Sequence, residues 1–475
     1  MAHQGMPGMD HEMARRPEVW LLALAGVAWF ATGAGGGLAG IVAATLPGAL
    51  LVTSATGHLL FPGDRLIARA GATGGFVGLV FALLMLPFAP LSALLLGVLS
   101  ALAGISAARL VAEDLELPDD QPVPEMDLKL SAEIVLDEAV IGGLTTFMGV
   151  YSQPIQARVG EELEETLDWL RAGGWLNEPA GFHETPLPIG PAAVASTRVA
   201  GLETEVMRFE SEFEPRQGAP GRSRWLGYGN NRTAEVRLVR AHRRRDWLIC
   251  VHGLGMGRAW LDFRALNARW LHQRGVNIAF PVLPLHGPRA INHLASGAGF
   301  ICGDVTNTLH ALTQTAWDIR RLIGWLRDEG AERVGLCGLS LGGYTTALIA
   351  SLEDDLDCAI AGIPAAEFGE LTCYHASGRA LALAAEANIT PERITTALTP
   401  VAPLMLRPRV AHHQRFIFGA LADRFVPPRQ VEALWRHWDQ PEIQWYPGGH
   451  LGFRFHWPVQ NLVDRALGAT VLRTR

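Results

Sequence analysis

The sequence predicts an α/β fold with a mostly parallel sheet, preceded by an N-terminal helical transmembrane region. Three observations support this fold class. The first 112 residues contain two long stretches without a charged side chain. From Trp247 onwards, short apolar runs alternate with helical patterns, and one run leads directly into Gly338-Leu339-Ser340-Leu341-Gly342. Continuous apolar runs are typical of strands that are buried on both faces, and strands that alternate with helices form parallel sheets.

The N-terminal region is predicted to span the membrane four times, within residues 1–112. No Asp, Glu, Lys or Arg occurs between Val19 and Gly63, or between Ala70 and Ala108. Each stretch is long enough for two helices of the roughly 20 residues that cross a bilayer. Natural breaks fall at the glycine-rich residues 33–37 and at Pro87-Phe88-Ala89-Pro90. We expect two hairpins, with helices near 18–34, 37–61, 71–88 and 90–109.

Arginines indicate how these helices are oriented. Arg15 and Arg16 precede the first helix, Arg65 and Arg69 lie between the hairpins, and Arg109 follows the fourth helix. The four-helix arrangement places all five on one side, and the positive-inside rule makes that side cytoplasmic. The rest of the chain would then lie in the cytoplasm.

Two other interpretations of this region stay open. Residues 1–34 could form a signal peptide, because arginines precede an apolar run, but the further apolar segments weigh against it. Alternatively, the apolar segments could be re-entrant or buried in an oligomer.

Residues 113–203 are expected to connect the membrane region to a C-terminal domain. Charge returns at Glu113-Asp114, and three prolines in the next ten residues stop any helix. Residues 131–172 have a helical pattern, whereas residues 173–200 are rich in Gly, Pro and Ala and are expected to be a loop.

The C-terminal domain is predicted to cover residues 204–475. Two early strands alternate polar and apolar residues, as half-exposed antiparallel strands do, and the later ones are continuously apolar. The expected strands are Glu205–Phe213, Ala234–Arg240, Trp247–Val251, Val276–Val282, Val334–Cys337, Asp357–Ile363, Phe416–Ala420 and Ile443–Tyr446. One helix face is marked by Ala316, Ile319, Leu322, Ile323 and Leu326. Active groups of such a sheet lie at the carboxyl ends of the strands.

Ser340 is the candidate nucleophile. A buried strand precedes it and an apolar helix pattern follows, which is the context of a G-x-S-x-G nucleophile elbow. Gly338 and Gly342 leave room for the sparsely allowed serine backbone. The following helix directs its positive end at the oxyanion formed in acyl transfer. The plain alternative is a glycine-rich turn with an inert serine.

Asp423 and His450 are the candidate partners of Ser340. Asp423 follows one strand end in Ala422-Asp423-Arg424, and His450 lies in a flexible turn after the last expected strand. The chain order Ser, Asp, His fits a triad in which His450 is the general base and Asp423 orients its ring. Asp423 could instead be a cap, with Asp357 as the rival acid, and His450 could be a surface residue.

The glycine turn His252-Gly253-Leu254-Gly255 follows the expected strand at Trp247–Val251. A turn at this place is where an oxyanion donor is needed, so the backbone N–H groups of Leu254 and Leu341 are the predicted donors. We expect His252 to brace the turn. Three further histidines could line the pocket but are expected to be structural: His286, His293 and His310.

Composition excludes several functions. A net charge of −7 without blocks of Lys or Arg argues against a nucleic-acid partner. The densest basic run, His242-Arg243-Arg244-Arg245, is interpreted as a solvated turn. The five cysteines form no C-x-x-C pair and are expected to be reduced, which favours a cytosolic domain. They are Cys250, Cys302, Cys337, Cys358 and Cys373. No spaced His/Cys cluster predicts a metal site, and no cofactor is expected.

With these motifs, residues 204–475 resemble an α/β-hydrolase of the serine esterase or lipase type. The turn Pro284-Leu285-His286-Gly287-Pro288-Arg289, together with the elbow, is similar to the dienelactone-hydrolase and prolyl-oligopeptidase branch. It is also similar to the group of α/β-hydrolase-domain-containing protein 18. The resemblance implies an eight-stranded sheet and a lid before the aspartate strand, which residues 367–410 would form. The membrane region is not part of the usual family pattern.

The sequence thus predicts a membrane-anchored serine hydrolase that cleaves carboxylic esters or thioesters, with acyl-lipids as one substrate class, through an acyl-enzyme on Ser340. Three alternatives remain at this point. The same triad could transfer the acyl group to an acceptor other than water. The fold could be a catalytically silent membrane scaffold. Peptidase activity uses the same triad chemistry, although no acidic pocket for a peptide N-terminus is evident. Protein partners are not indicated.

Overall fold

The computed structural model describes residues 13, 15–61, 63–147, 153–241, 245–292, 294–301 and 303–472. The basic residues 242–244, His293 and Cys302 lie outside the described residues. The chain divides into two compact units. The first unit comprises Met1–Phe147, Ala420–Pro428 and Tyr446–His456. The second comprises Met148–Gly419, Arg429–Trp445 and Trp457–Arg475.

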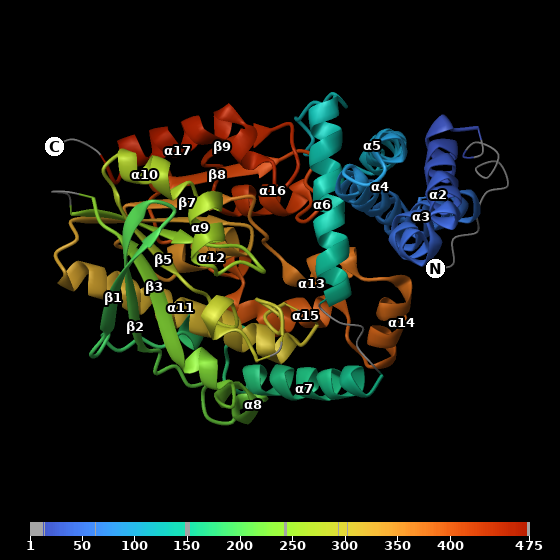
Figure 1. Ribbon diagram of the computed structural model, residues 1–475. Coiled ribbons are helices and arrows are strands. Elements are labelled where there is room, and N and C mark those ends of the chain that lie inside the picture. Colours follow the sequence, from blue (N-terminus) through green and yellow to red (C-terminus); the bar gives the residue numbers. More distant parts are fainter. Residues whose placement is uncertain are drawn as a thin grey trace. The chain divides into compact units, whose positions relative to one another are not determined.

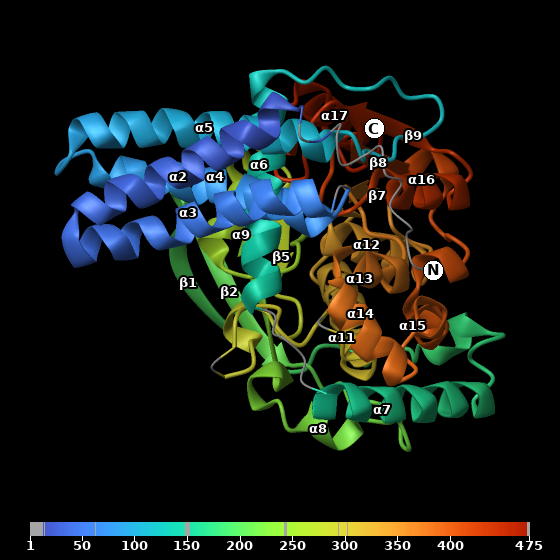
Figure 2. The same cartoon turned by 90° about the vertical axis from the view of Figure 1, so that its right-hand side faces the viewer.

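The first unit contains a bundle of four long helices (Figure 2). They are α2 (Pro17–Gly35), α3 (Gly37–Leu60), α4 (Arg65–Met85) and α5 (Pro90–Ala112). All four are long and apolar enough to cross a membrane. Helix α4 begins six residues before the predicted start, because the Asp64 carboxylate caps it by accepting the N–H of Leu66 at 2.8 Å. A fifth helix of this unit, α6 (Leu128–Phe147), packs against α4 and α5.

The bundle buries small residues together with Trp29 and a few leucines, and it exposes many large apolar side chains. Trp29 is buried and donates from its indole Nε1 to Ser100 Oγ at 3.0 Å. A Cβ added to Gly75 would lie 2.7 Å from the Cα of Gly104, so α4 and α5 touch along their backbones. The exposed outer side chains include Trp20, Leu24, Val27, Leu38, Val42, Leu84 and Leu91. Such a surface suits hydrocarbon rather than water.

Charged side chains lie close together at one end of the bundle. Arg16, just before α2, forms an ion pair with Glu113, just after α5. Arg65, the first residue of α4, pairs with Glu116 at 3.0 Å. The ends of these helices that carry arginines therefore lie together.

The second unit is built on a nine-stranded sheet (Figure 1). The strands are β1 (Ala193–Val199), β2 (Leu202–Glu210), β3 (Thr233–Val239), β4 (Asp246–Val251), β5 (Asn277–Pro281), β6 (Arg333–Leu339), β7 (Cys358–Gly362), β8 (Arg415–Ala420) and β9 (Glu442–Tyr446). Their order is β1-β2-β3-β5-β4-β6-β7-β8-β9. The pairs from β1 to β5 are antiparallel, and those joining β5, β4, β6, β7 and β8 are parallel. The predicted α/β fold class is confirmed.

Strand β1 is the difference from the eight strands that the resemblance implies. It lies in residues 173–200, which were expected to be a loop. Its residues are almost all exposed, so no apolar alternation marks it. A two-residue turn, Ala200-Gly201, joins it to β2, and both turn residues have positive φ (50° and 83°). Such turns match the twist of a hairpin, which explains a strand formed by backbone pairing alone.

Helices cover both faces of the sheet. In Figure 1, α10 and α17 lie above the sheet and α11 lies below it. Helix α11 buries all five residues of the predicted apolar face. Helices α13, α14 and α15 lie in 367–410, the segment expected to form a lid. The helices of this unit are α7 (Gln153–Ala172), α8 (Arg222–Leu226), α9 (Ala259–Ala265), α10 (Ala268–Gln273), α11 (Val305–Asp328), α12 (Leu341–Ala350), α13 (Phe368–His375), α14 (Gly378–Glu386), α15 (Pro391–Leu398), α16 (Pro428–His437) and α17 (Trp457–Ala469).

The four described cysteines are unpaired. Cys250, Cys337 and Cys358 are buried on the neighbouring strands β4, β6 and β7. Burial raises the pKa of both Cys337 and Cys358 to about 12, so these thiols stay protonated and pack as small apolar groups.

Candidate active site

Ser340 lies at the turn between β6 and α12, with φ 58° and ψ −114°. A non-glycine residue in so sparsely populated a region costs on the order of 1–3 kcal/mol and persists only where its surroundings enforce it. Two backbone hydrogen bonds do so. The N–H of Ser340 donates to the carbonyl of Gly362 at 2.9 Å, and its own carbonyl accepts the N–H of Tyr344 at 3.0 Å. The residue is partly exposed, at the N-terminus of a ten-residue helix.

The two motif glycines are required by close packing around this turn. A Cβ added to Gly338 would overlap the carbonyl oxygen of Gly342. A Cβ added to Gly342 would overlap the carbonyl oxygen of Val251, at the end of the neighbouring strand β4. The G-x-S-x-G spacing therefore reflects contact between backbones on both sides of the serine.

The turn after β4 lies beside the nucleophile. A Cβ added to Gly253 would be 3.6 Å from the Cβ of Ser340. A buried ion pair holds the far end of the turn. Asp262 accepts the N–H of Gly257 at 2.9 Å and pairs with Arg237 at 2.8 Å, while Arg237 also donates to the Gly257 carbonyl at 2.9 Å. Leu254 lies within this turn and Leu341 directly follows Ser340, and their N–H groups remain the predicted oxyanion donors.

Two histidines near the turn are held as neutral rings. His252 accepts the N–H of Leu283 at Nε2 (3.1 Å), so its Nδ1 carries the proton and donates to the Gly253 carbonyl at 2.8 Å. Burial lowers the pKa of His252 to about 4 and that of His286 well below its usual value. The two rings contact each other at 5.0 Å between centroids. Both histidines therefore have a structural role, in which they hold the loops after β4 and β5 together.

Asp423 and His450 lie together in the first unit. His450 Nδ1 is 2.6 Å from Asp423 Oδ2, and both residues are buried. Asp423 Oδ1 accepts the N–H groups of Phe425 and Val426 at 2.9 and 2.7 Å. The Phe425 ring stacks on the imidazole at 4.7 Å. A carboxylate opposite Nδ1 fixes the tautomer that leaves Nε2 free to accept a proton.

Electrostatics separate His450 from the other buried histidines. Burial by itself would lower its pKa, but the Asp423 charge and hydrogen bond, with a smaller contribution from Asp137, raise the pKa above its usual value. His310, on α11, has its pKa lowered to about 4 by burial, although its Nε2 lies 2.7 Å from the Pro220 carbonyl. Among these rings, His450 is the one suited to hold a proton during a reaction near neutral pH.

The rival acid Asp357 lies at the wrong end of the sheet. Its Oδ2 accepts the N–H of Val334 at 2.9 Å, near the beginning of β6. Ser340 follows the other end of the same strand. Asp357 also lies 3.4 Å from Arg327, which gives it a structural role.

Sequence reasoning missed three carboxylates on α6, in the region interpreted as a helical connection. Glu133, Asp137 and Glu138 are buried. Asp137 accepts the backbone N–H of His450 at 2.6 Å. Acidic residues on the buried side of an otherwise apolar helix were the available signal, since buried carboxylates need partners.

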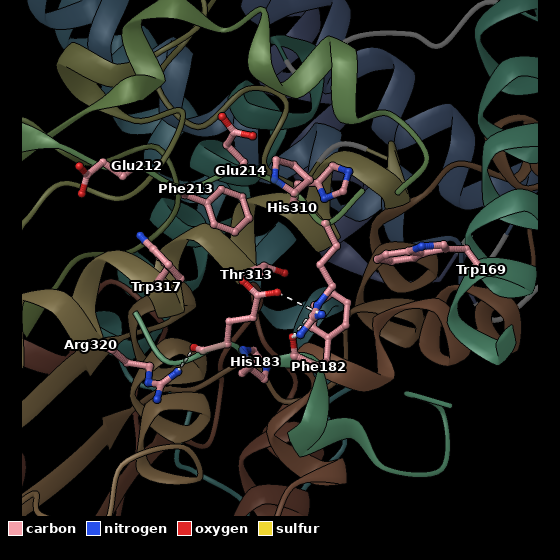
Figure 3. Close-up of a pocket in the computed structure, with 13 residues that line it drawn as sticks. Trp169, Phe182, His183, Glu212, Phe213, Glu214, His310, Thr313, Trp317 and Arg320 are labelled. Carbon is pink, nitrogen blue, oxygen red and sulfur yellow. Dashed lines mark hydrogen bonds and ion pairs between the residues drawn. The ribbon is translucent and has the colours of Figure 1, made fainter. Parts of the chain in front are cut away.

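The second unit also contains a separate cavity of about 150 Å³ (Figure 3). Aromatic and charged side chains line it, among them Trp169, Phe182 and Trp317. Neither Ser340 nor the Asp423–His450 pair belongs to its lining. Among the residues that the structure describes, no group of three or more His, Cys, Asp or Glu side chains could hold a metal ion.

A strained serine between a central parallel strand and a helix, with a glycine turn beside it, is the geometry of a G-x-S-x-G nucleophile elbow. A family model described as "Alpha/beta hydrolase domain containing 18" matches residues 229–365, which include the elbow and the glycine turn.

Two mycobacterial proteins are similar over most of the chain. "Uncharacterized protein MT2702" of Mycobacterium tuberculosis (strain CDC 1551 / Oshkosh) is 41% identical over 358 residues, covering 74% of this chain and 84% of the relative. "Uncharacterized protein Rv2627c" of strain H37Rv is 40% identical with the same coverage. The chain belongs to the same family as these proteins, within the α/β-hydrolase superfamily.

Solved structures show weaker likeness. An acetyl xylan esterase from Paenibacillus sp. R4 has a TM-score of 0.45 at 15% identity, covering 65% of this chain and 94% of that chain. An acylaminoacyl peptidase of Pyrococcus horikoshii has a TM-score of 0.37 at 14% identity, covering 61% and 43%. At these levels the two structures carry no information on the substrate.

Proposed function

We propose that this protein is a membrane-anchored serine hydrolase that cleaves carboxylic esters or thioesters through an acyl-enzyme on Ser340. The observation that carries the proposal is the backbone of Ser340, held at positive φ between two glycines that admit no Cβ. Strain of this kind in a non-glycine residue is concentrated at functional sites. The Asp423–His450 pair supplies the chemical partner that such a serine needs.

The reaction would proceed in two halves. His450 Nε2 takes the proton of the Ser340 hydroxyl while Oγ bonds to the acyl carbon. Asp423 stabilises the resulting imidazolium, and the N–H groups of Leu254 and Leu341 stabilise the oxyanion. The bond to the leaving group then breaks, and the leaving alcohol or thiol receives the proton from His450. Water repeats the sequence on the acyl-enzyme and releases the acid.

The N-terminal helices support a membrane location. Their outer surfaces are apolar, and the ends that carry arginines lie together. We place that end on the cytoplasmic side, with the hydrolase domain there as well. An enzyme held at a bilayer meets apolar acyl compounds at high local concentration, so acyl-lipids are the substrate class that we would test first.

Covalent labelling tests the proposal. The full chain in detergent should react with a fluorophosphonate probe and hydrolyse p-nitrophenyl esters, and Ser340→Ala should lose both activities. Ser351→Ala is a matched control, because Ser351 is a buried serine at the end of the same helix whose hydroxyl donates to the Ala347 carbonyl at 3.1 Å. Absence of labelling in the wild type, or equal labelling of Ser340→Ala, would refute the assignment.

A second measurement separates hydrolysis from acyl transfer. The acyl-enzyme partitions between water and any alcohol that reaches it. Free acid as the main product in the presence of added alcohols supports a hydrolase, whereas ester products would reassign the protein as an acyltransferase.

A further inference from the structure

Helix α6 contacts both loops that carry the Asp423–His450 pair. Three of its side chains are carboxylates with almost no exposure: Glu133 at 8%, Asp137 at 0% and Glu138 at 0%. Buried carboxylates persist only where donors or cations satisfy them. Their partners lie in 446–456, in 420–428 and, for Glu138, also on α4. All of these segments belong to the same compact unit as α6.

Glu133 and Asp137 hold the histidine loop by its backbone. Glu133 Oε2 accepts the N–H of Gly449 at 2.9 Å. Asp137 accepts the next two N–H groups, from His450 at 2.6 Å and from Leu451 at 3.1 Å. The two carboxylates are four residues apart and so project from one face of the helix. Three successive donors around the imidazole are therefore fixed from α6.

The glycines of this loop are explained by the same contacts. A Cβ added to Gly448 would lie 2.5 Å from Glu133 Oε2, and one added to Gly449 would lie 2.7 Å from Asp137 Oδ2. A Cβ on Gly452 would overlap the Glu133 carboxylate. Only residues without a side chain let the loop come this close to the helix.

Glu138 links the aspartate loop to membrane helix α4. Its Oε1 is 2.7 Å from Arg424 Nε, and Arg424 directly follows Asp423. Its Oε2 is 2.8 Å from Arg69 Nε on α4. The three side chains are 8% exposed or less, so charge pairing within them is weakly screened by solvent. Ala422 and Ala68 of α4 belong to one buried apolar cluster, which also includes Leu130 and Ile134.

Asp137 also affects the protonation of the Asp423–His450 pair. Burial, and then the nearby Asp423 charge, raise the pKa of Asp137 to about 7. The Asp137 carboxylate in turn contributes to raising the pKa of His450. Charged and titratable groups around the pair also include Glu133, Glu138, Arg69, Arg424, Tyr446 and His456.

We propose that α6 is part of the catalytic centre: Asp137 is a positioning residue that fixes His450, and Arg69 and Glu138 extend this support to membrane helix α4. This inference rests on the proposed hydrolase function and deepens it. The membrane region would then be needed to build the general base, beyond its role as an anchor.

The test uses the full chain in detergent with Asp137→Asn. Asparagine has nearly the same shape, but the N–H groups of His450 and Leu451 donate to different oxygens of Asp137, so the amide NH₂ group must face one of these donors. A catalytic group displaced by about 1 Å can lower the rate by up to ~100-fold. We therefore expect kcat and the fluorophosphonate labelling rate to fall by about 10- to 100-fold, with KM unchanged. Loss of the negative charge lowers the pKa of His450, so the acid limb of the pH–rate profile should move to lower pH.

Three further variants complete the test. Asp318→Asn removes another buried carboxylate, which pairs with Arg289 at 2.8 Å in the second unit. It should lower Tm but leave the acid limb in place. Arg69→Gln should lower kcat while Arg69→Lys, which keeps the charge, restores most of it; equal rates in Arg69→Gln and wild type would overturn the link to α4.

The outcomes distinguish a failure of this inference from a failure of the proposed hydrolase function. A wild type that does not label defeats the proposed function. If the probe labels the wild type, and Asp137→Asn has the same kcat and the same acid limb as the wild type, only the positioning role is refuted. A loss of Tm in Asp137→Asn without movement of the acid limb, measured per mole of folded protein, would also overturn it, because that is the result of a purely structural residue.

Discussion

Replacing Asp423 with asparagine exchanges an acceptor for a donor opposite His450 Nδ1. The structure decides how the new amide is oriented. Oδ1 of residue 423 accepts the N–H groups of Phe425 and Val426, so the carbonyl oxygen of asparagine stays there. Its NH₂ group then occupies the position of Oδ2, 2.6 Å from Nδ1. Nδ1 must accept this hydrogen bond, which leaves the proton on Nε2.

An imidazole with its proton on Nε2 cannot take a proton from Ser340. Loss of the correct tautomer in a serine triad lowers kcat by roughly 10⁴-fold, which corresponds to about 5.5 kcal/mol of transition-state stabilisation. The packing around residue 423 changes little, so Tm should stay close to that of the wild type.

Steady-state hydrolysis of a p-nitrophenyl ester at several pH values measures this effect. Asp357→Asn is the matched control, because it alters the rival acid and should leave kcat near the wild-type value. An Asp423→Asn protein with kcat within tenfold of the wild type would refute the assignment of the orienting carboxylate.

Three other results follow from the structure. Because Asp423 and Asp137 raise the pKa of His450 and the base acts when unprotonated, kcat/KM should rise with pH through a midpoint above the ordinary histidine value of about 6.5; a midpoint below it would contradict the geometry. Gly342→Ala places a methyl group against the Val251 carbonyl, so it should lower stability by about 1–3 kcal/mol and abolish labelling of the serine, as denaturation and probe assays would show. In intact cells, a membrane-impermeant maleimide should label Phe88→Cys, whereas Asp114→Cys should label only after lysis; the reverse pattern would invert the topology.

The elbow, the central strands and the Asp–His pair could be predicted from the sequence because each has a local signature. Ser340 is marked by its glycines, and the apolar runs mark strands buried on both faces. The start of α4 could also have been found, since Asp64 is an ordinary helix cap. Strand β1 could not be recognised by apolar periodicity, because it is exposed and depends on pairing with β2.

The role of α6 could not be predicted in this way. Asp137 and His450 are 313 positions apart, and no local pattern connects a helix that follows the N-terminal bundle to a loop near the end of the chain. Only tertiary structure shows that the carboxylates of the helix and the glycines of the loop are parts of one arrangement.

The separation between α6 and its partners also has a consequence for biosynthesis. Glu138 leaves the ribosome 286 residues ahead of Arg424, and Asp137 leaves it 313 residues ahead of His450. During that interval Arg69 is available to Glu138, but the donors of Asp137 at His450 and Leu451 have not been made, so Asp137 must stay hydrated, since burying it alone is strongly unfavourable. The four N-terminal helices can therefore form early, but α6 can reach its final packing only when the last part of the chain has been translated.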